Sequence, residues 1–170
     1  MLPTNLRSPS PISVSLYVTP PDQYTLRANS LPTYLLLNHH LALLAPDPKK
    51  HPSSKAGPKT SVGNDSLVAE NCTLGERVQI RKSVLSQGVE VGSRTVIRGS
   101  VIMSCVSIGE NAKIEGCVVC KGAKIEGNVS LTECFVGAGY VVEKGTKMAK
   151  QNLVELDALE DDDDEDEEEE

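Results

Sequence analysis

Aliphatic residues recur through the middle of the chain in steps of six, six and five residues, and the three steps then repeat. The recurring positions form three columns, and neighbouring residues within a column are 17 positions apart. The columns are Leu74, Val91, Ile108, Ile125 and Val142; Ile80, Ile97, Ile114 and Leu131; and Val68, Leu85, Ile102, Val119 and Val136. A heptad coiled coil repeats at seven residues, and Val, Ile, Thr and Gly disfavour helices, so this spacing predicts a repeating β-structure.

A second set of positions supports the same prediction. Two residues before each aliphatic stands a small or β-branched residue, in Cys72, Val78, Ser83, Val89, Thr95, Ser100, Val106, Ala112, Cys117, Ala123, Val129 and Cys134. Because residues i and i+2 of a strand face the same side, each hexad sends one large and one small side chain inward before a corner. The alternative is an ordinary antiparallel β-domain with chance spacing.

This pattern resembles the hexapeptide repeat of left-handed parallel β-helices. The resemblance implies an all-β fold, with about five three-sided coils over residues 62–147. The left hand comes from the resemblance, since the general rule for parallel crossovers would predict the right hand. Both open ends would expose apolar side chains and unpaired strand edges, so we expect a cap, a neighbouring domain or another chain to cover them.

Prolines and glycines are segregated along the chain. All ten prolines lie between Pro3 and Pro58, and twelve of the thirteen glycines lie between Gly63 and Gly145. This change of composition predicts a boundary near residue 61. We expect residues 1–61 to hold the remnant of an upstream domain, a connector helix and a linker, residues 62–147 the β-helix, and residues 148–170 an acidic disordered tail.

The first segment carries signals for one strand and one helix. Residues 14–18 could form a short edge strand. Ser30 can cap a helix that has Pro32 in its first turn, and Pro46 would end it. The apolar stripe of that helix would consist of Tyr34, Leu37, Leu41 and Leu44.

The net charge of −7 is distributed unevenly along the chain. Residues 160–170 are eleven consecutive acids, so the rest of the chain carries +4, and residues 62–159 hold eleven basic and eleven acidic residues. This balance disfavours a basic face for nucleic acid, which needs clustered Lys and Arg. The acidic run is expected to be solubilising, with attraction to a lysine-rich partner as the alternative.

No segment predicts a membrane or secretory destination. The N-terminus lacks the apolar core of a signal peptide, and residues 31–45 are too short to span a bilayer. The five cysteines are an odd number, and without an export signal we expect free thiols in the cytosol.

Residues with catalytic chemistry are sparse in the repeat. The resemblance to hexapeptide-repeat proteins implies that an acyltransferase of this fold would use a histidine beside the coils as its general base. In this chain His39, His40 and His51 all precede the first predicted coil, so an acyltransferase is disfavoured. Cys117 and Cys120 form a CxxC, but the 17-residue columns explain both, and a zinc site would need a second pair. We therefore predict no catalytic, cofactor-binding or metal-binding residues and no cofactor.

Residues outside the repeat resemble the gamma-subunit family of eukaryotic translation initiation factor two-B. The similarity lies in the connector segment of residues 24–34 followed by Asn38, the entry at 61–68, the body at 75–85 and the exit at 136–142 with Gly137-Ala-Gly-Tyr140. It spans about residues 14–147. In that family this β-helix follows a nucleotidyltransferase-like domain, which is missing here apart from its final elements.

The resemblance implies a cytosolic, non-catalytic assembly or regulatory subunit of the complex that exchanges GDP for GTP on initiation factor two. It implies as partners the other exchange-factor subunits, epsilon first, and initiation factor two itself, with no direct nucleic acid and no membrane. The protein is thus expected not to be an enzyme. The alternative is the C-terminal part of a sugar-1-phosphate nucleotidyltransferase similar to mannose-1-phosphate guanylyltransferase, and a third hypothesis is an independent scaffold.

Overall fold

The structure is a computed structural model that describes residues 27–45 and 49–154. In these ranges the chain forms helix α1 (Leu31–Leu44) and 18 short strands. The predicted strand at 14–18, the stop at Pro46 and the acidic run at 160–170 lie outside the described residues.

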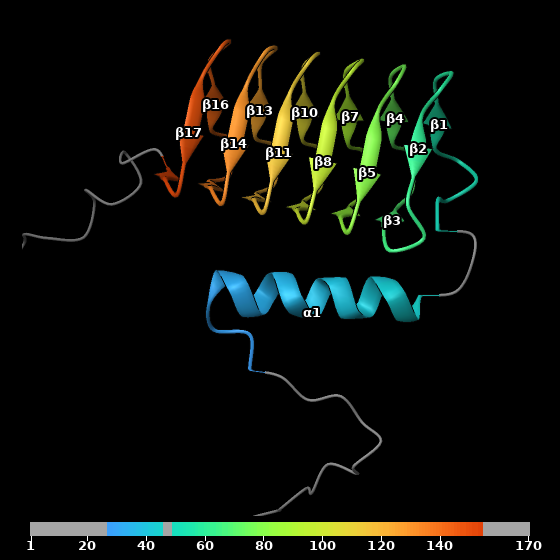
Figure 1. Ribbon diagram of the computed structural model, residues 1–170, viewed down its shortest axis with the longest axis horizontal. Coiled ribbons are helices and arrows are strands. Elements are labelled where there is room, and N and C mark those ends of the chain that lie inside the picture. The colour runs from blue at the N-terminus through green and yellow to red at the C-terminus, as the bar shows by residue number, and fades with distance from the viewer. Residues whose placement is uncertain (1–26, 46–48, 155–170) are drawn as a thin grey trace, which may run out of the picture.

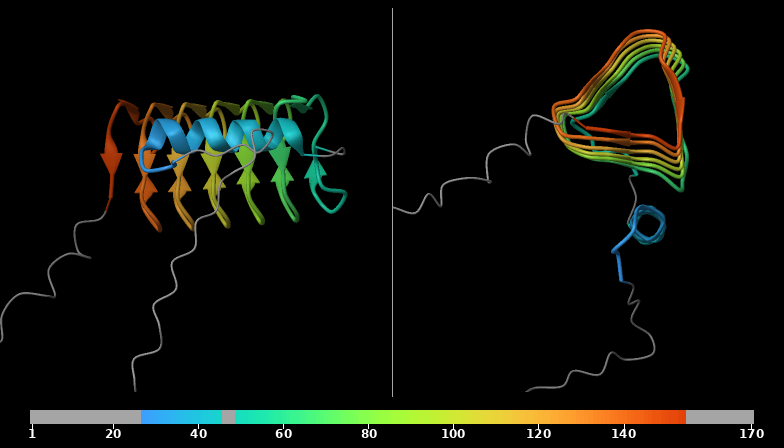
Figure 2. Two further views of the ribbon diagram at one scale, coloured as in Figure 1. Left: turned by 90° about the horizontal axis from the view of Figure 1, so that it is seen from below. Right: turned by 90° about the vertical axis from the view of Figure 1, so that its left-hand side faces the viewer.

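The strands are arranged in three parallel sheets, and each sheet takes every third strand of the chain. Sheet 1 consists of β1 (Lys55–Ala56), β4 (Thr73–Leu74), β7 (Glu90–Val91), β10 (Ser107–Ile108), β13 (Lys124–Ile125) and β16 (Val141–Val142). Sheet 2 consists of β2 (Ser61–Val62), β5 (Gln79–Arg81), β8 (Val96–Arg98), β11 (Lys113–Glu115), β14 (Ser130–Thr132) and β17 (Lys147–Ala149). Sheet 3 consists of β3 (Leu67–Val68), β6 (Val84–Leu85), β9 (Val101–Ile102), β12 (Val118–Val119), β15 (Phe135–Val136) and β18 (Asn152–Leu153). The three sheets enclose a triangular cross-section (Figure 2).

The 17-residue columns of the sequence are the lateral ladders of this β-helix. Ile97 pairs with Ile114, and Ile114 pairs with Leu131, each one coil further on. The three side chains are fully buried, and so are the small residues two positions before them. The predicted all-β parallel helix is therefore confirmed.

The coils extend beyond the predicted limits at both ends. Each sheet has six strands, where about five coils were expected, and the strands run from Lys55 to Leu153 instead of from 62 to 147. The outermost strands β1 and β17 pair through their main chains while all their residues are exposed. A pattern of buried aliphatics cannot reveal β1 and β17, because they bury no side chain, whereas Leu153 of β18 is buried and continues the column of Val136.

Each coil turns its corners through residues with positive φ. At the corner between sheets 1 and 2 the non-glycine residues of this kind are Lys59, Arg77, Arg94, Asn111 and Asn128, with φ between 57° and 61°. Such a conformation costs a residue other than glycine about 1–2 kcal/mol. The main-chain bonds between coils help to offset this cost, as where the Arg94 N–H donates to the Glu76 carbonyl at 2.8 Å.

A ladder of buried serines and cysteines lines the corner between sheets 2 and 3, in the order Ser66, Ser83, Ser100, Cys117 and Cys134. The Ser100 hydroxyl donates to the Arg98 carbonyl at 2.8 Å and accepts from the Cys117 N–H at 3.1 Å. The Cys117 thiol repeats the arrangement with Glu115 and Cys134. This column needs small side chains that can both donate and accept, which explains Cys117 as a structural residue.

Helix α1 runs along the outside of sheet 3, parallel to the long axis of the β-helix (Figures 1 and 2). The outward residues of the first five strands of this sheet are apolar, namely Leu67, Val84, Val101, Val118 and Phe135, and only β18 places a polar residue, Asn152, there. In β9 and β12 the outward residues are as buried as the inward ones, at 2 % exposed. The helix therefore covers an apolar stripe that would otherwise face solvent.

The start of α1 follows the sequence, but its buried face follows the sequence only in part. Ser30 is the N-cap and forms a capping box with Thr33, and Pro32 lies in the first turn, as predicted. In the predicted stripe, Tyr34 and Leu37 are half-buried. The prediction is wrong for the second half of the helix, where Leu41 and Leu44 are exposed and Ala42 is buried. Leucines occur on all sides of this helix, so their periodicity does not single out one face. The Lys49 ammonium donates to the carbonyls of Ala42, Leu43 and Ala45 and closes the C-terminal end.

Candidate functional site

Helix α1 carries five of the eight large apolar side chains that are exposed among the described residues, and we call the side turned away from sheet 3 its outer face. Leu36 and Leu43 lie seven residues apart on this face and are 55 % and 60 % exposed, and Leu41 and Leu44 are also exposed. Contiguous exposed apolar side chains on a folded domain mark contact surfaces for other proteins. We call Leu36 and Leu43 the outer leucines of α1.

Two apolar grooves lie beside the N-terminal half of α1, where the helix meets sheet 3. One has a volume of about 390 Å³ and includes Tyr34, Met103 and Phe135. The other has a volume of about 370 Å³ and includes Leu35 and Cys134. Both are open and mostly apolar, so they suit the side chains of a partner protein better than a polar small molecule.

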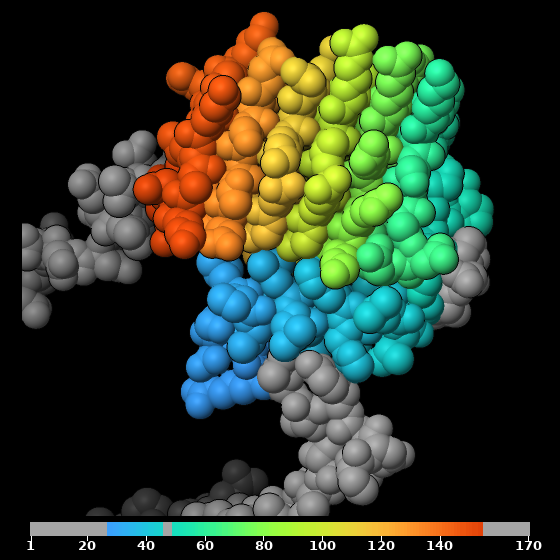
Figure 3. Space-filling view, in the orientation of Figure 1, coloured from blue at the N-terminus to red at the C-terminus, as the bar shows by residue number. Residues whose placement is uncertain are grey.

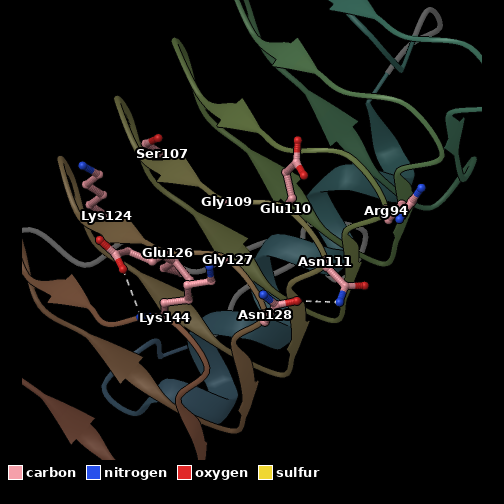
Figure 4. Close-up of a pocket in the computed structure, with 11 residues that line it drawn as sticks. Arg94, Ser107, Gly109, Glu110, Asn111, Lys124, Glu126, Gly127, Asn128 and Lys144 are labelled. Atoms are coloured by element: carbon pink, nitrogen blue, oxygen red, sulfur yellow. Dashed lines mark hydrogen bonds between the residues drawn. The ribbon is translucent and has the colours of Figure 1, made fainter.

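A third groove, of about 500 Å³, lies at the corner between sheets 1 and 2 (Figure 4). Its side chains carry both charges, with Arg94, Lys124 and Lys144 beside Glu110 and Glu126. Asn111 donates to Asn128 at 2.8 Å, and the main-chain N–H of Lys144 donates to the Glu126 carboxylate at 3.0 Å. The residues that line the groove include no histidine and no cysteine, so their chemistry is that of charged and amide recognition.

One of the three histidines lies beside the coils, contrary to the expectation from their positions in the sequence. His39 precedes the coils in sequence, but α1 carries it back along the β-helix, where its ring lies close to Gly99. Its Nε2 atom is buried and has no hydrogen-bond partner within the described residues. His39 lies at the junction of helix and sheet and lines none of the three grooves described above. Separation along the chain was therefore no guide to separation in space.

The pKa of His39 is expected to make the docking of α1 sensitive to pH. Burial of the ring lowers the pKa of His39 below its ordinary value of 6.5, and the neighbouring Lys82 charge acts in the same direction, while Asp65 and the Lys82 main chain oppose it. Between the lowered pKa and 6.5 the unfolded chain binds more protons than the folded chain, so stability falls as the pH falls through this range. Urea denaturation at pH 7 and pH 5 measures the loss. His39→Gln should show a smaller loss, and equal losses in the two proteins would contradict the assignment.

The cysteines are free thiols in this structure. Burial raises the pKa of the Cys117 thiol to about 11, so it stays protonated at neutral pH and is a poor nucleophile. Cys120 is half-buried and follows the inward Val119 at the next corner. The CxxC is thus explained by the coil geometry. The wider prediction of no catalytic, cofactor or metal residue remains a prediction.

Within residues 27–45 and 49–154, no helix is long and apolar enough to cross a membrane.

Comparison with known proteins finds one family whose model matches this chain and solved structures that share its fold. The family model described as the EIF2B subunit epsilon LbH domain matches residues 50–149. It supports a relationship to initiation factor two-B and the left hand of the β-helix, but it does not confirm the gamma assignment. A search of the curated proteins found no match.

Solved structures with a similar fold are hexapeptide-repeat enzymes. A histidine-to-alanine mutant of GDP-perosamine N-acetyltransferase from Caulobacter crescentus, in complex with CoA and GDP-perosamine, is 17% identical with a TM-score of 0.57 over 61% of this chain and 50% of that chain. A hexapeptide transferase family protein from Anaplasma phagocytophilum is 18% identical with a TM-score of 0.46, over 58% of this chain and 60% of that one. The chain thus matches about half the length of the acetyltransferase.

These neighbours correct the expectation that the chain is not an enzyme. The fold seen here is also that of an acetyltransferase, and His39 lies beside the coils, so the position of the histidines in the sequence no longer argues against an enzyme. At 17% identity the likeness shows the fold alone, and it assigns no reaction to this chain.

Proposed function

The chain belongs to the family of the EIF2B subunit epsilon LbH domain, whose model matches residues 50–149, and from this premise we propose that it is a gamma-like subunit of the cytosolic factor that exchanges GDP for GTP on initiation factor two. The family match supports the relationship to initiation factor two-B, and the gamma part of the proposal rests on the resemblance of residues 24–34 and of Gly137-Ala-Gly-Tyr140. The subunit acts in this complex through protein contacts that assemble it and that engage initiation factor two. Its first partner is the epsilon subunit.

The surface of α1 supports a role in assembly. The outer leucines are more than half exposed, and apolar grooves flank the same helix. Apolar side chains at the centre of an interface supply most of its binding energy, and truncating such a residue commonly costs about 2 kcal/mol or more. We therefore place the epsilon contact on the outer face of α1.

Co-expression with the epsilon subunit of the same organism tests the proposal. The expected result is co-elution of the two chains in size-exclusion chromatography, at low and at moderate salt, because an apolar contact is little screened by ions. The double variant Leu36→Gln with Leu43→Gln should weaken co-elution about tenfold or more. Val141→Gln is the matched control, because Val141 is 48 % exposed on sheet 1, away from α1.

Three outcomes are informative. Loss of co-elution with the leucine variant and not with the control supports both the complex and the site. Co-elution with both variants keeps the proposed complex and moves the contact off α1. A folded chain that never co-elutes with epsilon would refute the proposed function.

A further inference from the structure

The β-helix carries one strongly basic face, although residues 62–159 are neutral in sum. Six exposed cations of the first three coils lie on sheet 2 and its two corners, and we call them the basic face: Lys59, Arg77, Arg81, Lys82, Arg94 and Arg98. This is the face turned toward the viewer in Figures 1 and 3. Lys and Arg residues therefore do cluster on one face of the folded coils, although the net charge of this stretch disfavoured such a cluster.

The repeat itself stacks these charges. Arg81 and Arg98 are directly paired in neighbouring strands of sheet 2, and Arg77 and Arg94 occupy the same corner of successive coils. Neighbouring strands are about 4.8 Å apart, so like charges repel along both columns. A row of repelling cations is relieved when an anion lies across it.

The nearby acids neutralise this face only in part. Glu115 lies 3.8 Å from Arg98, but it also lies 3.1 Å from Lys113. Asp65 accepts the main-chain N–H of Lys82 rather than its ammonium. Within the described residues, no carboxylate lies within ion-pair distance of the side chains of Arg77, Arg81, Lys82 or Arg94.

The same chain supplies an anion of matching length and charge in its run of eleven acids, residues 160–170. The last described residue, Val154, follows β18 at the far end of the β-helix. This end lies at the corner between sheets 3 and 1, opposite sheet 2, so the chain must first pass along one side of the prism, a path of about 20 Å. Strands β8 and β5 are three and four strands from β17, about 15 and 19 Å further along sheet 2. Residues 155–170 can span about 53 Å when extended, so the last acids of the run can reach both strands.

We propose that the acidic run of residues 160–170 lies across the basic face of its own chain. Tethering gives the run a local concentration in the millimolar range, which favours it over an untethered anion. The contact is electrostatic and exposed, so it weakens with salt. An acidic segment of another protein must then displace the run before it can use this face. This inference does not depend on the exchange-factor proposal.

Zero-length carbodiimide cross-linking of the full chain, followed by peptide mass spectrometry, tests the contact. At about 20 mM salt we expect cross-links from Lys59 and Lys82 to residues 160–170, and at about 0.5 M salt at least a fivefold loss of these links. Lys55 of β1 is exposed on sheet 1 in the same coil as Lys59, off the basic face, and serves as the internal control. The full-length variant Arg77→Gln, Arg81→Gln and Arg94→Gln should lower the Lys82 links severalfold, whereas Lys55→Gln should not.

Dilution separates a contact within one chain from a contact between chains. The proposal expects the links in the monomer band, with a yield that does not change on tenfold dilution. Links found only between chains, or spread evenly over all exposed lysines, would overturn it. It would also be overturned if no links form while the full chain binds an oligothymidylate through the same arginines, because the face would then be open to nucleic acid.

Discussion

Replacing Ile114 with alanine is expected to lower the free energy of unfolding by about 2–5 kcal/mol. Ile114 is fully buried at the centre of the β-helix, between Ile97 of the preceding coil and Leu131 of the following one. The two neighbouring coils are held in register by main-chain bonds, so they cannot move inward to fill the space. The loss then contains the full cost of the cavity as well as the cost of transferring fewer methyl groups.

Lys113→Ala provides the control in the same strand. Lys113 is the outward neighbour of Ile114, and its ion pair with Glu115 is solvent-exposed, so its removal should cost less than about 1 kcal/mol. Urea denaturation of both variants, at a pH where each is folded, measures the difference. A loss below about 1 kcal/mol for Ile114→Ala would contradict a close-packed interior at this column.

Replacing Gly109 with asparagine is expected to be the second most damaging change, at about 3 kcal/mol. A Cβ atom at Gly109 would lie 2.6 Å from the main-chain nitrogen of Gly127 and 2.7 Å from the carbonyl carbon of Glu126. Both are main-chain atoms of the next coil, and the Gly109 N–H already donates to the Ile125 carbonyl at 2.7 Å. The side chain can therefore fit only if two coils separate.

The same substitution at Gly122 should be nearly neutral, with a change below about 0.5 kcal/mol. A Cβ atom there would meet nothing within 4 Å. Although Gly122 has a φ of +71°, Asn71 adopts a φ of 55° at an equivalent corner, and asparagine tolerates this conformation. Thermal or urea denaturation of the two variants side by side gives the comparison. Equal losses would show that backbone strain, and not the contact between coils, dominates at these glycines.

The cross-section of the β-helix could be read directly from the sequence. In a parallel β-helix with in-register strands, a residue stacks on the residue one coil away, so a constant period in sequence becomes a ladder in space. This is why Ile80, Ile97 and Ile114 were assigned to the interior, and why Cys117 was recognised as part of a structural column. The start of α1 was equally local, because Ser30 and Thr33 cap the first turn without help from the rest of the fold.

The position of α1 on the β-helix could not be predicted from the residues of the helix alone. The outward apolar residues of sheet 3, such as Val101 and Val118, also recur every 17 residues, so the need for a cover was present in the sequence. Which segment supplies the cover, and which side of it turns inward, depends on contacts between residues far apart in the chain. Leucines on all sides of α1 gave no preference, and the packing against sheet 3 buried Ala42 and brought His39 to the coils.

The sequence by itself determined the period, the interior and the three-sided form of this protein, because in-register stacking converts spacing into contact. Only the tertiary structure decided what the outer surface presents. Arg81 and Arg98 belong to a stretch whose charges sum to zero, yet they face the same side, because outward residues of one column share a sheet. Net charge sums over all faces, whereas recognition depends on a single face, and the assignment of residues to faces requires the folded coils.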